Sequence, residues 1–271
     1  MSLFDSLKAD RLGRNAVSAH SQANELNRRG KVADARAKYA EAQALYQQAY
    51  DAGCRRTNIL MSYSILLMRG GEFERARELM KEISQDRAMS EDTHFELRVN
   101  YSICLWRLGL LDKAIETIRY AGKHAKNSSY YSSLGTYLVE QAAQTGDFAE
   151  AQALLDEAMD YDDEDAATLD NLGELYRQQG IWAEKNGDAA AAAEMYAKSR
   201  DYYQRAYKQR PSQITTLYAL ANFAREDGDT AKAREMQELA NRSFALGGLD
   251  DSFAVSRLRL HFRCRRRTMR R

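Results

Sequence analysis

The chain has 271 residues, a formal net charge of +1 and a single proline. So few prolines favour long helices with few forced breaks. No apolar run approaches the ~20 residues of a membrane-spanning helix, and the three cysteines are too widely spaced to suggest a disulfide framework. These features predict a helical, cytoplasmic protein with reduced thiols and no membrane attachment.

Residues 1–15 open the chain and are expected to form a lead-in or capping helix. Residues 16–246 then repeat one pattern six times. Its most regular member is a glycine, and these marker glycines follow one another at intervals of 41, 38, 37, 41 and 41 residues: Gly30, Gly71, Gly109, Gly146, Gly187 and Gly228. Five places after each comes an alanine: Ala35, Ala76, Ala114, Ala151, Ala192 and Ala233. Recurrence at such a period predicts an array of structural repeats.

Each copy is predicted to be two helices joined at the marker glycine, because glycine tolerates the left-handed conformation needed just beyond a helix end. The alanine lies in the second helix. Seven places before the marker glycine, the first helix also carries a small or slim residue: Ala23, Ser64, Ser102, Val139, Gly180 or Ala221. Small side chains on both sides of one crossing predict a tightly packed helical hairpin. Asp147, Asp188 and Asp229 directly follow marker glycines and are expected to cap second helices.

The pattern resembles the tetratricopeptide repeat (TPR), whose motif combines a Leu-Gly step and a tyrosine in the first helix with small and aromatic residues in the second. The matching residues are Leu172, Gly173 and Tyr176 in one first helix, Tyr203, Ala206 and Pro211 at the end of the next second helix, and, more loosely, Leu134, Gly135 and Leu138. The resemblance covers about residues 16–246. It implies an all-α fold, a right-handed superhelical solenoid of about six hairpins, and a non-enzymatic role as a protein–protein interaction scaffold.

The chain departs from the family pattern in its period, which is longer than the family's. In the fifth repeat, Gly173 lies fourteen residues before Gly187, and Pro211 lies twenty-four after it, where seven and seventeen are usual. Both helices of the fifth hairpin are therefore predicted to be about 10 Å longer than usual. Trp182 lies on this extension and is expected to pack on the alanine run 189–193.

The first helices of such an array are expected to line a concave groove. Projecting the family's positions onto this chain gives eleven candidate partner-binding residues: Asn24, Met61, Ile65, Met68, Val99, Ile103, Trp106, Thr136, Glu174, Tyr218 and Asn222. The surface is apolar in the second and third repeats, where methionine and tryptophan suit an adaptable binding patch. We expect an extended or helical peptide with hydrophobic anchors to dock there. The alternative is that these residues are ordinary interhelix core, and full burial of Ile65 and Ile103 would favour it.

The sequence contains no recognisable catalytic motif. None of the four histidines lies in a metalloprotease motif or near a cysteine pair, and glycine-rich phosphate loops are absent. The protein is therefore predicted not to be an enzyme and to need no cofactor or metal. Some TPR proteins clamp the acidic tail of chaperones with lysine and arginine. Because the first candidate positions here are His20, Asn24 and Ser62, a clamp of that type is not expected.

The last fifteen residues carry eight arginines and no acid, which leaves residues 1–256 with a net charge of −7. Residues 247–271 are predicted to be a disordered Arg-rich tail whose basic patch includes Arg263, Arg265, Arg266 and Arg267. Arginine neutralises phosphate well, so an alternative function is an adaptor that associates with nucleic acid or ribonucleoprotein through the tail. A regulator whose effector is a partner chain, and self-association of the array, are further alternatives.

Overall fold

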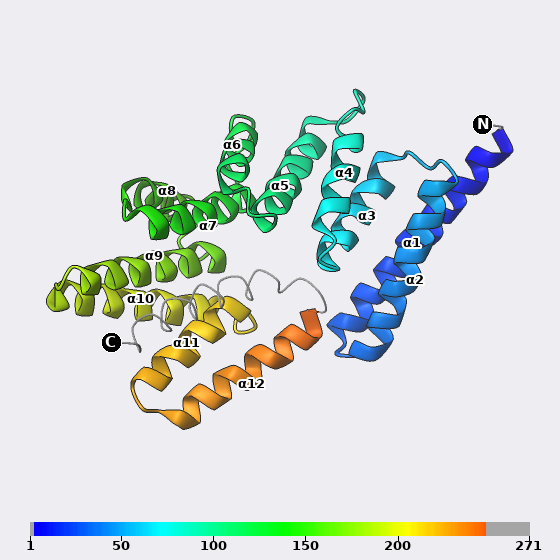
Figure 1. Cartoon of the computed structure of the whole chain (residues 1–271). Helices are drawn as coiled ribbons and strands as arrows, with labels where there is room; N and C mark the ends of the chain where they lie inside the picture. Colours follow the sequence, from blue (N-terminus) through cyan, green and yellow to red (C-terminus); the bar gives the residue numbers. More distant parts are fainter. Residues whose placement is uncertain (1–2, 248–271) are drawn as a thin grey trace. The chain divides into compact units, whose positions relative to one another are not determined.

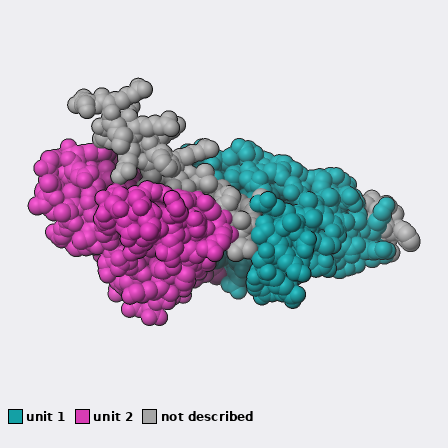
Figure 2. Space-filling view, turned by 90° about the horizontal axis from the view of Figure 1, so that it is seen from below, with its two compact units in different colours: residues 1–110, 244–252 teal, residues 111–243, 253–271 magenta. Residues whose placement is uncertain are grey.

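The computed structural model describes residues 3–247, and within this range the chain forms twelve α-helices (Figure 1). Two compact units, coloured separately in Figure 2, divide these residues near Leu110. The first unit contains α1 (Leu3–Arg28), α2 (Val32–Asp51), α3 (Thr57–Arg69), α4 (Phe73–Ile83) and α5 (Glu91–Arg107). The second begins with α6 (Leu111–Gly122) and continues through α7 (Ser128–Thr145), α8 (Ala149–Tyr161), α9 (Ala166–Lys185), α10 (Ala189–Gln209), α11 (Ile214–Glu226) and residues 230–243 of α12 (Thr230–Gly247).

The marker glycines join helices as predicted. All six have a positive φ, between 75° and 82°. Glu72, which follows Gly71, donates its backbone N–H to the carbonyl oxygen of Leu67 at 2.9 Å. This bond satisfies a carbonyl that the end of α3 would otherwise leave unpaired. The chain therefore reverses within two residues and sends α4 back along α3.

Methyl-sized side chains set the distance between paired helices, also as predicted. The six alanines that follow the marker glycines are at most 4% exposed. Their counterparts in the first helices Ala23, Ser64, Ser102 and Ala221 are fully buried, and Val139 and Gly180 are buried as well. In the first unit α1 packs along α2 and α3 packs on α4, and in the second α7 packs on α8 and α9 on α10.

Aspartates cap second helices of the second unit, which confirms another expectation. The Asp188 carboxylate accepts a hydrogen bond from the backbone N–H of Ala191 at 2.9 Å. Asp147 and Asp229 make the corresponding bonds to the backbone N–H groups of Ala149 and Lys232. Each carboxylate thereby satisfies a donor that the first turn of a helix leaves free.

The first helix is longer than the repeat pattern indicated. α1 continues without a break from Leu3 to Arg28, so residues 1–15 do not form a separate capping helix within the described part. Its early half is packed, because Ala9 and Ala16 are buried and Gly13 faces Ile59 of α3. A Cβ at Gly13 would lie 2.7 Å from the Cδ1 atom of Ile59. The small residues that allow this contact precede the repeated motif, which is why the pattern did not reveal them.

The fifth hairpin is lengthened as predicted, with 20 residues in α9 and 21 in α10. The expected position of Trp182 was wrong, however. Its indole N–H donates to the carbonyl oxygen of Ala143 in α7 at 3.3 Å, and its ring lies against Gly146. The tryptophan therefore connects α9 to the preceding hairpin, because the extra turns of α9 extend over the end of α7.

Gly180 and Gly70 offer a matched test of close helix packing. A Cβ at Gly180 would lie 2.6 Å from the Tyr196 ring, so Gly180→Ala is expected to destabilise the protein by about 1–3 kcal/mol through overpacking. Gly70 has φ −78° and its Cβ position is no closer than 3.4 Å to any other group. Gly70→Ala is therefore expected to be neutral or slightly stabilising. Urea unfolding of both variants measures the difference, and equal losses would contradict the packing assignment.

Candidate partner-binding surface

An open row of side chains crosses the first helices of the first unit. Asn24 of α1, Ile65 of α3 and Ile103 of α5 each lie six residues before their marker glycine. Asn24 is exposed, Ile65 is 38% exposed and Ile103 is half-buried. Since neither isoleucine is fully buried, the surface predicted from the sequence is retained at this row, which we call the Asn24–Ile65–Ile103 row.

Four other apolar candidates are core residues, so their predicted exposure was wrong. Met61, Met68, Val99 and Trp106 are between 6% and 8% exposed. They lie ten or three places before the marker glycines, and the structure turns those positions toward neighbouring helices. The sequence also allowed these four residues to be part of the core between helices, and this alternative is correct for them.

The open face instead uses positions nine and thirteen before the marker glycine, beside the row itself. Ser62 and Asn100 are half-buried, and Asn58 and Glu96 are exposed. Steps of three and four residues keep side chains on one face of a helix, so these positions and the row form a single stripe on each first helix. The row is thus flanked by polar side chains, two of them amides that can both donate and accept hydrogen bonds.

The second helices and the next hairpin hold Asn24 in place. The Asn24 side-chain oxygen accepts hydrogen bonds from the Tyr39 hydroxyl and from the guanidinium of Arg69, both at 2.7 Å. The guanidinium carbon of Arg69 also lies 4.7 Å from the centroid of the Tyr39 ring. The sequence offered a signal for this arginine, since Arg28, Arg69 and Arg107 each lie two residues before a marker glycine.

A buried histidine lies beneath this corner of the row. His20 of α1 is 8% exposed and contacts the rings of Tyr39 and Tyr46 edge-on. One ring nitrogen, Nδ1, lies 3.3 Å from the Tyr46 hydroxyl. Burial, assisted by the nearby Arg69 charge, lowers the pKa of His20 below its ordinary value. Burial likewise raises the pKa of Tyr46 to about 12, so both groups are neutral at pH 7.

The His20 environment predicts that acid destabilises the protein. Because the folded-state pKa lies below the ordinary value of 6.5, stability is fully present above pH 6.5 and is lost as pH falls through the lower, folded-state value. One proton limits this slope to about 1.4 kcal/mol per pH unit. Urea unfolding between pH 7.5 and pH 5 measures it. His20→Gln should flatten this part of the profile, and an unchanged profile would contradict the assignment.

In the second unit, two candidates predicted on the groove are buried. Thr136 of α7 is 9% exposed and donates its hydroxyl to the side-chain oxygen of Asn171 at 3.0 Å. Glu174 of α9 is 6% exposed. It pairs with Arg177 at 2.6 Å and accepts a hydrogen bond from the Tyr203 hydroxyl at 2.8 Å. Their polar character reflects bonding between helices, so their expected place on an open surface was wrong.

The remaining two candidates of the second unit, Tyr218 and Asn222 of α11, are half-buried. The Tyr218 hydroxyl bonds the side chain of Asn241 at 3.4 Å, and Asn222 accepts from Arg225 at 2.6 Å. Both therefore remain candidates for partner contact.

The Glu174–Arg177 pair predicts a large mutational effect. Burial acts to lower the pKa of Arg177, but the Glu174 carboxylate outweighs it and raises that pKa. Glu174→Ala would leave a buried guanidinium without its carboxylate and should cost about 3–5 kcal/mol of stability. Urea unfolding checks this. The double variant Glu174→Leu/Arg177→Met removes both charges and should recover much of the loss; equal losses in the two variants would contradict the pairing.

The paired helices, glycine turns and alanine crossings are those of a TPR array, and two stretches of sequence agree. Residues 22–90 and residues 135–157 each match a family model described as tetratricopeptide repeat. This chain is a member of the TPR superfamily. As a TPR fold it is suited to act as a protein–protein interaction scaffold.

Solved structures of similar fold accompany this match. The human IFIT1 dimer with m7Gppp-AAAA superposes with a TM-score of 0.54 at 17% identity, over 74% of this chain and 45% of IFIT1. This likeness shows a shared all-α superhelical repeat fold, and the present chain spans less than half of IFIT1. MamA (MSR-1) gives a TM-score of 0.47 at 17% identity, covering 70% of this chain and 98% of MamA. YrrB, titled a TPR protein with an unusual peptide-binding site, gives 0.43 at 15% identity, covering 75% and 91%. No curated protein sequence matches the TPR chain significantly.

Three further points concern membrane spans, metal sites and the Arg-rich tail. Within the described range, no helix is long and apolar enough to cross a membrane. In the same range, no group of three or more histidine, cysteine, aspartate and glutamate side chains is placed to hold a metal ion. The predicted basic patch of the tail, Arg263, Arg265, Arg266 and Arg267, lies outside the described residues.

Proposed function

We propose that the first unit binds an extended peptide segment of a partner protein along the Asn24–Ile65–Ile103 row. The observation that carries this proposal is the exposure of Ile65, at 38%, on a helix whose other large apolar side chains are buried. Ile103 occupies the same position in the next first helix and is half-buried. Two apolar side chains at equivalent positions suit two apolar anchors of one peptide.

Polar side chains beside the row supply the second part of the recognition. Asn58 and Asn100 can bond the main-chain N–H and carbonyl groups of an extended peptide without regard to its side chains. Asn24 is already oriented by Tyr39 and Arg69, so binding requires little ordering of this end of the surface. The apolar anchors then provide affinity, and the amides fix the direction and register of the peptide.

The proposed role is non-enzymatic and cytoplasmic. Cys54 and Cys104 are buried free thiols, which suits a reducing compartment. The alternative role in nucleic-acid or ribonucleoprotein binding depends on the Arg-rich tail, which lies outside the described residues. The peptide-binding role depends on side chains that the structure describes, and it is the role proposed here.

A paired capture experiment tests the proposal. The full chain and its Ile65→Glu/Ile103→Glu variant are used as baits in source-cell lysate, and captured proteins are identified by mass spectrometry. The double variant places two carboxylates where apolar anchors would lie, so it should reduce capture of the partner at least about tenfold. Binding of a synthetic peptide from that partner should fall by the same factor.

Leu7→Glu provides the matched control. Leu7 is 58% exposed on the same helix as Asn24 and lies about 25 Å away along the helix axis. Its substitution adds a charge to an exposed apolar position without altering the row, and capture should persist. Circular dichroism should show equal helicity for all three proteins. Equal capture by the wild type and the double variant would refute binding at the row.

A further inference from the structure

A groove lies on the second unit between α6 and α8, at some distance in the chain from the row of the first unit. Both helices pack on α7, which forms the floor with Tyr130, Leu134 and Leu138. The hollow has a volume of about 530 Å³. Gly122 gives it this shape, because a Cβ at that position would lie 2.2 Å from the Tyr130 ring. The ring can therefore lie close under the end of α6.

Two ion pairs cross the groove from α6 and the turn after it to α8. Arg119 pairs with Glu150, and Lys126 pairs with Glu157 at 2.6 Å. Each pair joins residues 31 apart in sequence, and the two pairs are seven residues apart on both sides. Lys126 lowers the pKa of Glu157, so this carboxylate is charged in the neutral range. Cations on the α6 side of the groove thus face carboxylates on the α8 side at a constant sequence offset of 31 residues.

A third cation lies between these two pairs, and its counterpart on α8 is not acidic. Lys123 lines the same groove, and the residue 31 places further on is Leu154, with Ala153 next to it. Within the described residues, the contact of the Lys123 ammonium is with the Tyr120 ring, 5.4 Å from its centroid. An acidic residue at this register would complete a third ion pair. The small side chain of Ala153, which is exposed, leaves room for one from outside.

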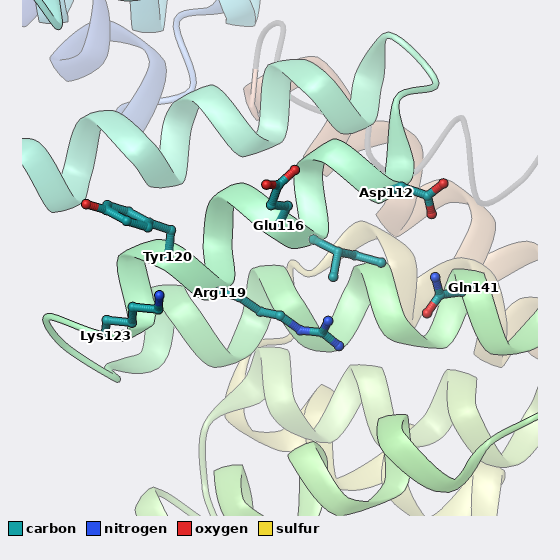
Figure 3. A pocket seen from close by; sticks show the side chains of 7 residues that line it. Asp112, Glu116, Arg119, Tyr120, Lys123 and Gln141 are labelled. Atoms are coloured by element: carbon teal, nitrogen blue, oxygen red, sulfur yellow. The ribbon is translucent and has the colours of Figure 1, made fainter.

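The outer side of α6 adds a second hollow beside the same cations. Arg119 and Tyr120 of α6, Lys123 just after it and Gln141 of α7 line this hollow, and Figure 3 shows the Arg119 side chain extending toward Gln141. This hollow has a volume of about 400 Å³ and shares Arg119 and Lys123 with the groove. Tyr120 is 55% exposed. Tyrosine and arginine are enriched where proteins bind one another.

We propose that the groove between α6 and α8 binds an acidic segment of a partner protein. An aspartate or glutamate side chain of the segment pairs with Lys123 and completes the row of ion pairs between Arg119–Glu150 and Lys126–Glu157. Its aliphatic part contacts Ala153 and Leu154. The occupant is acidic rather than basic because both groove carboxylates already have cationic partners. Among the described residues, the contact of the middle cation, Lys123, is with an aromatic ring and not with a carboxylate. This site shares no residue with the Asn24–Ile65–Ile103 row, so a test of one proposal does not decide the other.

Fluorescence polarisation with two labelled peptides tests the site on the full-length protein. One peptide is acetyl-Ala-Glu-Leu-Glu-Ala-amide, and the other has glutamine in place of both glutamates. The glutamate peptide should bind the wild type at low salt, and Lys123→Met should weaken its binding by about two- to fivefold. Ala153→Glu should weaken it similarly, because it places a carboxylate of the protein itself opposite Lys123. Both variants alter exposed positions, so circular dichroism should show unchanged helicity.

Lys113→Met is the matched control, since Lys113 is exposed on α6 but does not line the groove. It should bind the glutamate peptide like the wild type. Equal binding of both peptides, absence of binding to the wild type, or binding that survives Ala153→Glu would overturn the proposal. Sedimentation of the same proteins distinguishes a second copy of the chain as the occupant. A dimer that Lys123→Met dissociates, without peptide binding, would assign the groove to self-association and overturn the acidic partner.

Discussion

The fold depends on one contact, the crossing of two helices over methyl-sized or smaller side chains. Ala76 meets α3 near Ser64, and both are fully buried, so the helices approach closely enough to exclude larger groups. Because each hairpin is held chiefly by such a crossing and by its neighbours, stability accumulates along the array and does not arise from one central core. The faces turned away from the crossings do not determine how closely the paired helices approach. Their side chains can therefore serve in binding, and the candidate surfaces lie on these faces.

The hairpins could be read from the sequence because their constraints are local and repeat. A left-handed backbone at a turn requires glycine, and a close crossing requires alanine or serine, so the residue type itself records the geometry. The open face was harder to read. Met61 and Ser62 are adjacent on α3, yet one is buried and the other is half-exposed. If the projected face of a helix is wrong by one position, core residues are taken for surface residues and the reverse. Residue type does not reveal the error, because apolar side chains occur both in the core and on the surface of a thin solenoid.

Contacts between hairpins were the least predictable. The fit of Gly13 against Ile59, and of Trp182 against the end of α7, depends on how far one helix extends past the next. The same holds for the polar side chains in the second unit. Glu174 looked like a surface residue because glutamate is mostly exposed in proteins, but Arg177 lies one turn further along α9 and Tyr203 reaches it from α10. Such a network is visible only when three helix faces are known together.

The packing of Trp182 has a consequence for how this molecule can be observed. The chain has two tryptophans, and they fall one in each unit: Trp106 is buried in the first, and the Trp182 indole is bonded to α7 in the second. Indole emission shifts when the ring meets water, so each unit contains its own optical reporter. Two single-tryptophan proteins would therefore give separate melting curves for the two units. Coincident curves would mean that the array unfolds as one cooperative block, and distinct curves that its halves open independently.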